Sequence, residues 1–147
     1  IWFLGGTGGD APAERTCLKR IPAGKQFFFP LVNLVVWDEP LNTAERRQLL
    51  DDIFSDQVPG EPAAEACRLS ATLDGTPMIF DGIPIERVQS PTFTYLGDKK
   101  ALADGFWVLS PKLKRGKHTL SFSGGLCSFG SNTSFFDVDV TYNFTVR

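Results

Sequence analysis

The chain has 147 residues, of which 42% are hydrophobic and 22% charged, and its formal net charge is −2. These values are typical of one globular domain that is large enough to bury a core. The nearly neutral charge argues against nucleic acid or an anionic membrane as a partner. The chain also has no apolar run long enough for insertion into a bilayer.

Turn residues divide the chain into many short segments with strand character. Gly, Pro and Asp interrupt runs that are rich in Phe, Val and Thr, and this spacing favours a β-sandwich or a jelly roll. Tight turns are expected at Asp74-Gly75 and Asp104-Gly105. The expected strands cover residues 1–4, 15–19, 27–37, 68–73, 78–80, 85–89, 92–96, 106–109, 117–123 and 135–146.

The last expected strand has the clearest pattern. Apolar residues occupy positions 136, 138, 140, 142, 144 and 146, and polar residues fill the positions between them. Such alternation is typical of a strand with one face in a core and the other in water. Asp137 and Asp139 therefore lie on the solvated face, which argues against a catalytic role for this pair.

One helix is expected between the strands. Asn42 is a suitable N-cap, and Glu45 three residues later completes a capping box, so the helix should cover residues 43–54. Residues 63–66 favour another short helical turn. Together these elements predict a mainly β protein: an antiparallel, jelly-roll-like β-sandwich with one inserted helix, forming a single domain over residues 1–147.

The three cysteines do not form a recognisable motif. The spacing of Cys17, Cys67 and Cys127 matches neither a zinc site nor a Cys-x-x-Cys pair. The sequence leaves two alternatives open, because spacing constrains pairing loosely. Either one disulfide forms and one thiol is left over, or all three thiols are buried.

No catalytic motif is present. The glycine-rich segment 5–9 is not followed by the Lys-Ser/Thr pair of a phosphate-binding loop. His118 is the only histidine, and the chain has no Gly-x-Ser-x-Gly nucleophile elbow. No cofactor or metal is expected. The dispersed carboxylates Glu86, Asp98 and Asp104 would have to meet in one cleft to support glycoside hydrolysis.

Two groups of residues are candidates for ligand binding. The loop 128–134 contains Phe129 and Asn132 and is followed by Phe135, and loops on a rigid sandwich often carry function. The turn before strand 117–123 gathers basic side chains, which could bind an anion or simply be solvated. The candidate residues of this second group are Lys114, Arg115 and His118.

Several segments resemble a group of uncharacterised exported bacterial proteins. The resemblance rests on segments in a consistent order: 2–7 (WFLGGT), 15–25 (RTCLKRIPAGK), 88–91 (VQSP), 103–107 (ADGFW), 116–124 (GKHTLSFSG) and 139–142 (DVTY). It implies a periplasmic or secreted protein but brings no established activity. The group has more sequence upstream, including a cysteine, so this chain is expected to lack an N-terminal segment and the partner of Cys17.

These observations favour a non-enzymatic, extracytoplasmic binding or interaction module with a glycan or a protein as its ligand. An exposed sheet edge would also allow a homodimer. The alternative is a carbohydrate-active hydrolase that uses the dispersed carboxylates. A third possibility is a structural subunit of an envelope assembly, which a large apolar patch on one sheet would favour.

Overall fold

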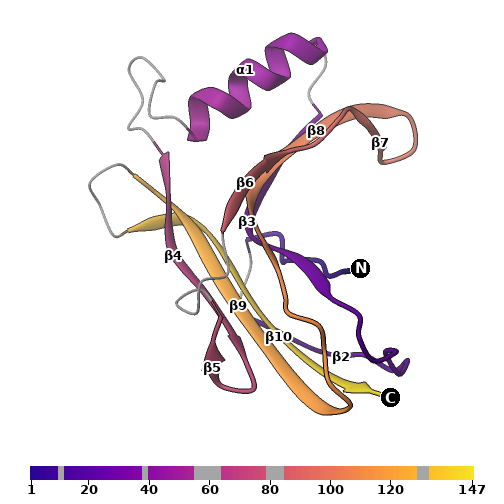
Figure 1. Cartoon of the computed structure of the whole chain (residues 1–147). Helices are drawn as coiled ribbons and strands as arrows, with labels where there is room; N and C mark the ends of the chain where they lie inside the picture. Colours follow the sequence, from indigo (N-terminus) through magenta and orange to yellow (C-terminus); the bar gives the residue numbers. More distant parts are fainter. Residues whose placement is uncertain (10–11, 38–39, 55–63, 79–84, 129–132) are drawn as a thin grey trace.

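The computed structural model describes residues 1–9, 12–37, 40–54, 64–78, 85–128 and 133–147. They form two mixed β-sheets and a single helix, so the predicted mainly β sandwich with one inserted helix is confirmed (Figure 1). The strands are β1 (Trp2–Phe3), β2 (Ala13–Thr16), β3 (Phe27–Val36), β4 (Ala64–Leu73), β5 (Thr76–Pro77), β6 (Glu86–Gln89), β7 (Phe93–Tyr95), β8 (Lys99–Leu109), β9 (Gly116–Ser128) and β10 (Ser134–Val146), and the helix is α1 (Thr43–Phe54).

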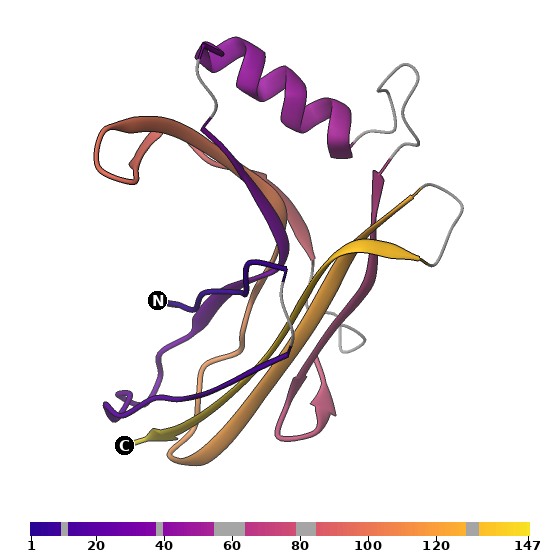
Figure 2. The ribbon, with the colours of Figure 1, turned by 180° about the vertical axis from the view of Figure 1, so that it is seen from behind.

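The sheets are built largely from antiparallel neighbours. Sheet A has the order β1-β3-β8-β6, with β7 paired to β8, and sheet B has the order β2-β10-β9-β4-β5. Two edge pairs are parallel, β1 with β3 and β2 with β10. The first residues of the chain therefore supply one edge strand to each sheet. Figure 2 shows these strands from behind.

The main core lies between the two sheets, in the lower half of the molecule as drawn in Figure 1. In β10 the alternating residues Val138, Val140 and Phe144 are buried, as the sequence pattern predicts. The ring of Phe29 from β3 lies 4.7 Å from the ring of Phe122 from β9, measured between centroids. Each such aromatic side chain contributes about 2 kcal/mol through burial of its apolar surface.

A bulge in β3 brings the two sheets close together. The pairing of β3 with β8 shifts between Pro30 and Val32. Near this bulge Gly124 of β9 faces the carbonyl oxygen of Leu31, and a Cβ atom at position 124 would lie 2.7 Å from that oxygen. A glycine is therefore required for the close approach of the sheets at this point.

Helix α1 begins as predicted. The backbone amide of Asn42 donates to the Glu45 carboxylate at 2.7 Å, and the Asn42 side chain accepts from the amides of Ala44 and Glu45. This is the expected capping box. The helix packs against β8, β4 and β3 and buries Leu50. It is too short and too polar to cross a bilayer, and it is the one helix in the described part of the chain.

Arg87 of β6 fixes α1 to sheet A. Its guanidinium donates to the carboxylate of Asp104 at 2.7 Å and to that of Asp51 on the helix at 2.8 Å. The same group lies 5.2 Å from the centre of the Phe54 ring. These two carboxylates raise the pKa of Arg87, the hydrogen bond to Asp104 being the largest cause. Asp104 itself is fully buried.

Several expected boundaries are wrong. Asp104-Gly105 was expected to form a turn but lies within β8, which begins at Lys99, because pairing with β3 and β6 continues through it. The expected helical turn at 63–66 is replaced at residues 64–66 by the start of β4, which pairs with β9. The strand expected at 15–19 is β2, which covers Ala13–Thr16, so it begins two residues earlier and ends three residues earlier. For the strand expected at 78–80, residues 79–80 lie outside the described residues.

Candidate functional site

The structure separates the predicted binding residues. Phe129 and Asn132 lie outside the described residues. Phe135 is exposed near the start of β10, about 36 Å along that strand from its other end. The far end of β10 pairs with the beginning of β9, where His118 lies. Lys114 and Arg115 are exposed in the turn just before β9. The basic candidates therefore share one end of the molecule, and Phe135 lies at the other.

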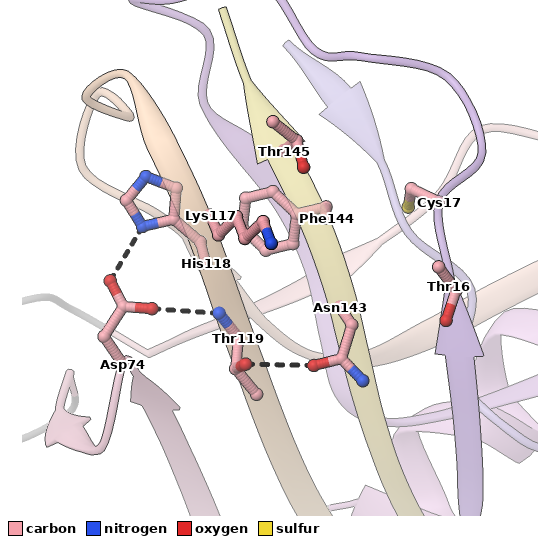
Figure 3. A pocket seen from close by; sticks show the side chains of 9 residues that line it. All are labelled: Thr16, Cys17, Asp74, Lys117, His118, Thr119, Asn143, Phe144 and Thr145. Carbon is pink, nitrogen blue, oxygen red and sulfur yellow. Dashed lines mark hydrogen bonds and ion pairs between the residues drawn. The ribbon is translucent and has the colours of Figure 1, made fainter.

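An open pocket of about 310 Å³ occupies this basic end of sheet B, and we call it the strand-end pocket (Figure 3). Strands β2, β10 and β9 lie side by side here, and the turn between β4 and β5 borders the pocket. Its lining consists of Thr16, Cys17, Asp74, Lys117, His118, Thr119, Asn143, Phe144 and Thr145.

The hairpin turn between β4 and β5 positions Asp74. Asp74 and Gly75 both have positive φ angles, 54° and 78°, as a type I′ turn requires. The expected tight turn at Asp74-Gly75 is therefore confirmed. It directs the carboxylate of Asp74 toward β9, where one oxygen accepts from the amide of Thr119 at 2.9 Å and the other lies 2.7 Å from Nδ1 of His118.

His118 bridges two acceptors. Its Nδ1 faces Asp74, and its Nε2 lies 2.9 Å from the carbonyl oxygen of Lys114. Both ring nitrogens are therefore engaged within the protein. The ring also stacks on Phe144, with 5.5 Å between the ring centroids. His118 is therefore held firmly between the turn 110–115 and the hairpin.

The Asp74 carboxyl group is held in its charged form. Burial tends to raise its pKa, but the hydrogen bond from His118, the hydrogen bond from the Thr119 amide and the charge of His118 together outweigh burial. The pKa of Asp74 is therefore lower than usual. The pocket thus has a fixed carboxylate at one margin.

Hydroxyl and amide groups cover the floor of the pocket. The hydroxyl of Thr119 donates to the Asn143 side chain at 2.9 Å, and the amide of Asn143 donates to Glu14 at 2.7 Å. The side chains of Thr16, Lys117 and Thr145 make no hydrogen bond to the described part of the chain. Their donors and acceptors are therefore available to a ligand.

Cys17 lines the margin opposite His118, across β10 (Figure 3). It is a free thiol, half-buried, and burial raises its pKa. Cys67 and Cys127 form a disulfide between β4 and β9, with 5.9 Å between their Cα atoms. Of the two alternatives left open by the sequence, one disulfide with one free thiol is therefore the one observed.

The dispersed carboxylates do not meet in one cleft. Asp104 is buried against Arg87 beneath α1, whereas Glu86 pairs with Trp107, which lies three residues from Asp104 and so on the opposite face of sheet A. Asp98 is exposed in the turn between β7 and β8. No three His, Cys, Asp or Glu residues of the described ranges form a group suited to a metal ion.

The sequence pointed to His118 but not to the groups around it. The alternation in β9 and β10 places Thr119 and Asn143 on the solvated face, so the sequence pattern could have predicted that their side chains face solvent. The contact of Asp74 with His118 joins positions 44 residues apart. No local pattern indicates such a contact, because it depends on the pairing of β4 with β9.

Comparison with known proteins gives no match: no family model, no curated protein and no solved structure is similar to this chain. The resemblance to exported bacterial proteins is untested and stays a prediction.

Proposed function

We propose that this protein is a non-enzymatic, extracytoplasmic binding module whose strand-end pocket holds a glycan. The observation that carries the proposal is the pocket itself: an open hollow lined by hydroxyl and amide side chains from three adjacent strands. Such groups can both donate and accept, as sugar hydroxyls do. The half-buried ring of His118, which stacks on the buried Phe144, lies beside these polar groups.

The disulfide supports a location outside the cytoplasm. Disulfides such as Cys67–Cys127 form and persist in oxidising compartments and are uncommon in the cytosol. Cys17 does not contribute to this argument. The exported character implied by the sequence resemblance points in the same direction.

Cys17 provides a direct test of ligand binding in the pocket. It is the single free thiol of the chain, so alkylation reports on this site alone. We expect a bound oligosaccharide to slow the alkylation of Cys17 at least about fivefold, measured near about pH 9 because burial raises the pKa of the thiol. The oligosaccharide would be chosen from a glycan array probed with the intact protein.

A pair of variants makes the test specific. Thr145→Tyr places a large side chain in the pocket, whereas Thr94→Tyr makes the same exchange at an exposed position of β7 on the other sheet. Thr145→Tyr should abolish glycan binding, and Thr94→Tyr should leave it unchanged. An array without hits, or a protein ligand that binds Thr145→Tyr normally, would overturn the proposal.

A further inference from the structure

The end of the sandwich that holds the strand-end pocket carries eight of the 15 Lys and Arg residues of the chain. We call this surface the cationic end. All eight side chains are exposed. Its members are Lys19, Arg20, Lys25, Lys112, Lys114, Arg115, Lys117 and Arg147.

Backbone hydrogen bonds bring these residues together from three segments of the chain. The amide of Ala23 donates to Arg147, and the amide of Arg147 donates to Ile21, at 2.8 and 2.9 Å. The loop 19–25 is joined to the turn before β9 in the same way, because the amide of Leu113 donates to Lys25 at 2.9 Å. Figures 1 and 2 show the C-terminus, this loop and this turn at one end of the molecule.

The cations of this end have no acidic partners among the residues that the structure describes. The ion pairs within the described ranges involve none of the eight residues. Residues 15–37, 105–136 and 140–147 contain no Asp or Glu. Two carboxylates border the cationic end, and both are engaged, Asp74 by His118 and Glu14 by Asn143. The net charge of −2 therefore conceals a strongly positive surface, balanced by acids elsewhere.

We infer that the cationic end binds an acidic polysaccharide, a glycan with carboxylate or sulfate groups repeated along its chain. This inference rests on the proposed function and extends it. The pocket supplies hydrogen bonds to sugar hydroxyls, and Lys117 within it joins the pocket to the surrounding cations. Dispersed cations on separate segments suit a ligand whose charges are also dispersed, and they raise the rate of encounter.

Two other polyanions fit the surface less well. An anionic membrane would favour several exposed apolar residues among the cations, and among the described basic segments Leu18 alone is a large exposed hydrophobic residue, at 95%. Single-stranded nucleic acid would favour exposed aromatic rings for base stacking, and none of the large exposed hydrophobic residues on these described segments is aromatic.

The test compares polygalacturonate with its fully methyl-esterified form, because the two share a backbone and differ in charge. By calorimetry we expect the acid form to bind at least about tenfold more tightly than the ester. Raising NaCl from about 50 to about 200 mM should weaken that binding about tenfold or more, since salt screens exposed charges. The ester should show little dependence on salt.

Matched charge reversals locate the surface. K114E/R115E reverses two cations of the cationic end, whereas K99E/K100E reverses two exposed cations at the start of β8 and changes the net charge equally. The first variant should lose affinity for polygalacturonate at least about tenfold and the second less than about twofold. K19E/R20E, on a different segment of the cationic end, should lose as much affinity as K114E/R115E. Equal losses from two separate segments would rule out a local folding defect as the cause.

The outcomes separate the inference from the proposed function. Equal affinity for the acid and the ester, with protection of Cys17 retained, would overturn the acidic ligand and leave the glycan pocket standing. Equal losses in K114E/R115E and K99E/K100E would overturn the assigned surface. Tighter binding to phosphatidylglycerol vesicles or to DNA than to polygalacturonate would overturn the choice of polyanion. Absence of binding to any glycan would remove both proposals.

Discussion

At Asp74 one carboxylate joins a hairpin turn to the start of β9 through the Thr119 amide and the His118 ring. Because the pKa of this carboxyl is lowered in the folded protein, its charged form favours folding. This contribution is present above the pKa of an unfolded Asp, about 3.9, and is lost as the pH falls through the lower folded value.

We expect Asp74→Asn to be less stable than the wild type by up to about 1 kcal/mol near neutral pH, since the pair is partly exposed. Asn tolerates the positive φ of the turn, so the backbone should be undisturbed. The difference in the free energy of unfolding should shrink between neutral pH and a pH well below about 3.9, as the Asp74 carboxyl group becomes protonated. Urea denaturation at the two pH values measures it, and an unchanged difference would contradict the assigned role of the charge.

The burial of a side chain could be predicted where the alternation of a strand determines it. It could not be predicted where pairing with distant strands determines it. The alternation in β10 correctly placed Val140 and Phe144 in the core. Asp104 was expected in a turn because Asp-Gly is a strong turn signal, yet neighbouring strands on both sides hold it in β8. A local preference of this kind yields to the pairing energy of two flanking strands.

Helix α1 depends on Arg87, which connects its Asp51 to the buried Asp104 of β8. We expect Arg87→Met to lower the free energy of unfolding by about 3 kcal/mol, because it leaves the buried carboxylate of Asp104 without its cationic partner. The double variant R87M/D104L should recover most of this loss, since it removes the stranded charge. Chemical denaturation measures both variants.

Arg68→Met is the matched control for Arg87→Met. Arg68 also pairs with an aspartate, Asp137, but both side chains are about half-exposed, at 51% and 48%. Its loss should cost less than about 1 kcal/mol. Equal losses in the two single variants would show that burial of Asp104 does not govern the strength of the Arg87 contact.

The boundaries of α1 could be read directly from the chain, whereas those of several strands could not. The signal for the helix is local, since Asn42 and Glu45 lie three residues apart and contact each other. The start of β4 has no such signal, because Ala64 and Ala66 favour a helix until they pair with β9. The ends of these strands therefore depend on pairing with neighbouring strands, which the local sequence does not indicate.

Across the whole molecule, the Cys67–Cys127 disulfide closes a long segment within sheet B, with the two cysteines 60 positions apart. We expect Cys67→Ser/Cys127→Ser to lower the free energy of unfolding by about 2–4 kcal/mol, because an open chain gains more disorder on unfolding. Reduction by dithiothreitol should lower the melting temperature of the wild type in the same direction.

Cys17→Ser controls for the loss of sulfur alone. Its thiol is free, so this change should shift the free energy of unfolding by less than about 1 kcal/mol. A double variant as stable as the wild type would contradict the assigned contribution of the disulfide. The composition of the chain could not have revealed this bond, because three cysteines allow three pairings.

The pairing of β2 with β10 sets an order on biosynthesis. Each of the residues 13–16 leaves the ribosome 127 positions before its partner in β10, among residues 140–143. Strand β10 is also an interior strand, with β2 on one side and β9 on the other. Sheet B therefore closes only after translation of this segment is complete, and until then its nascent edges need protection from neighbouring chains.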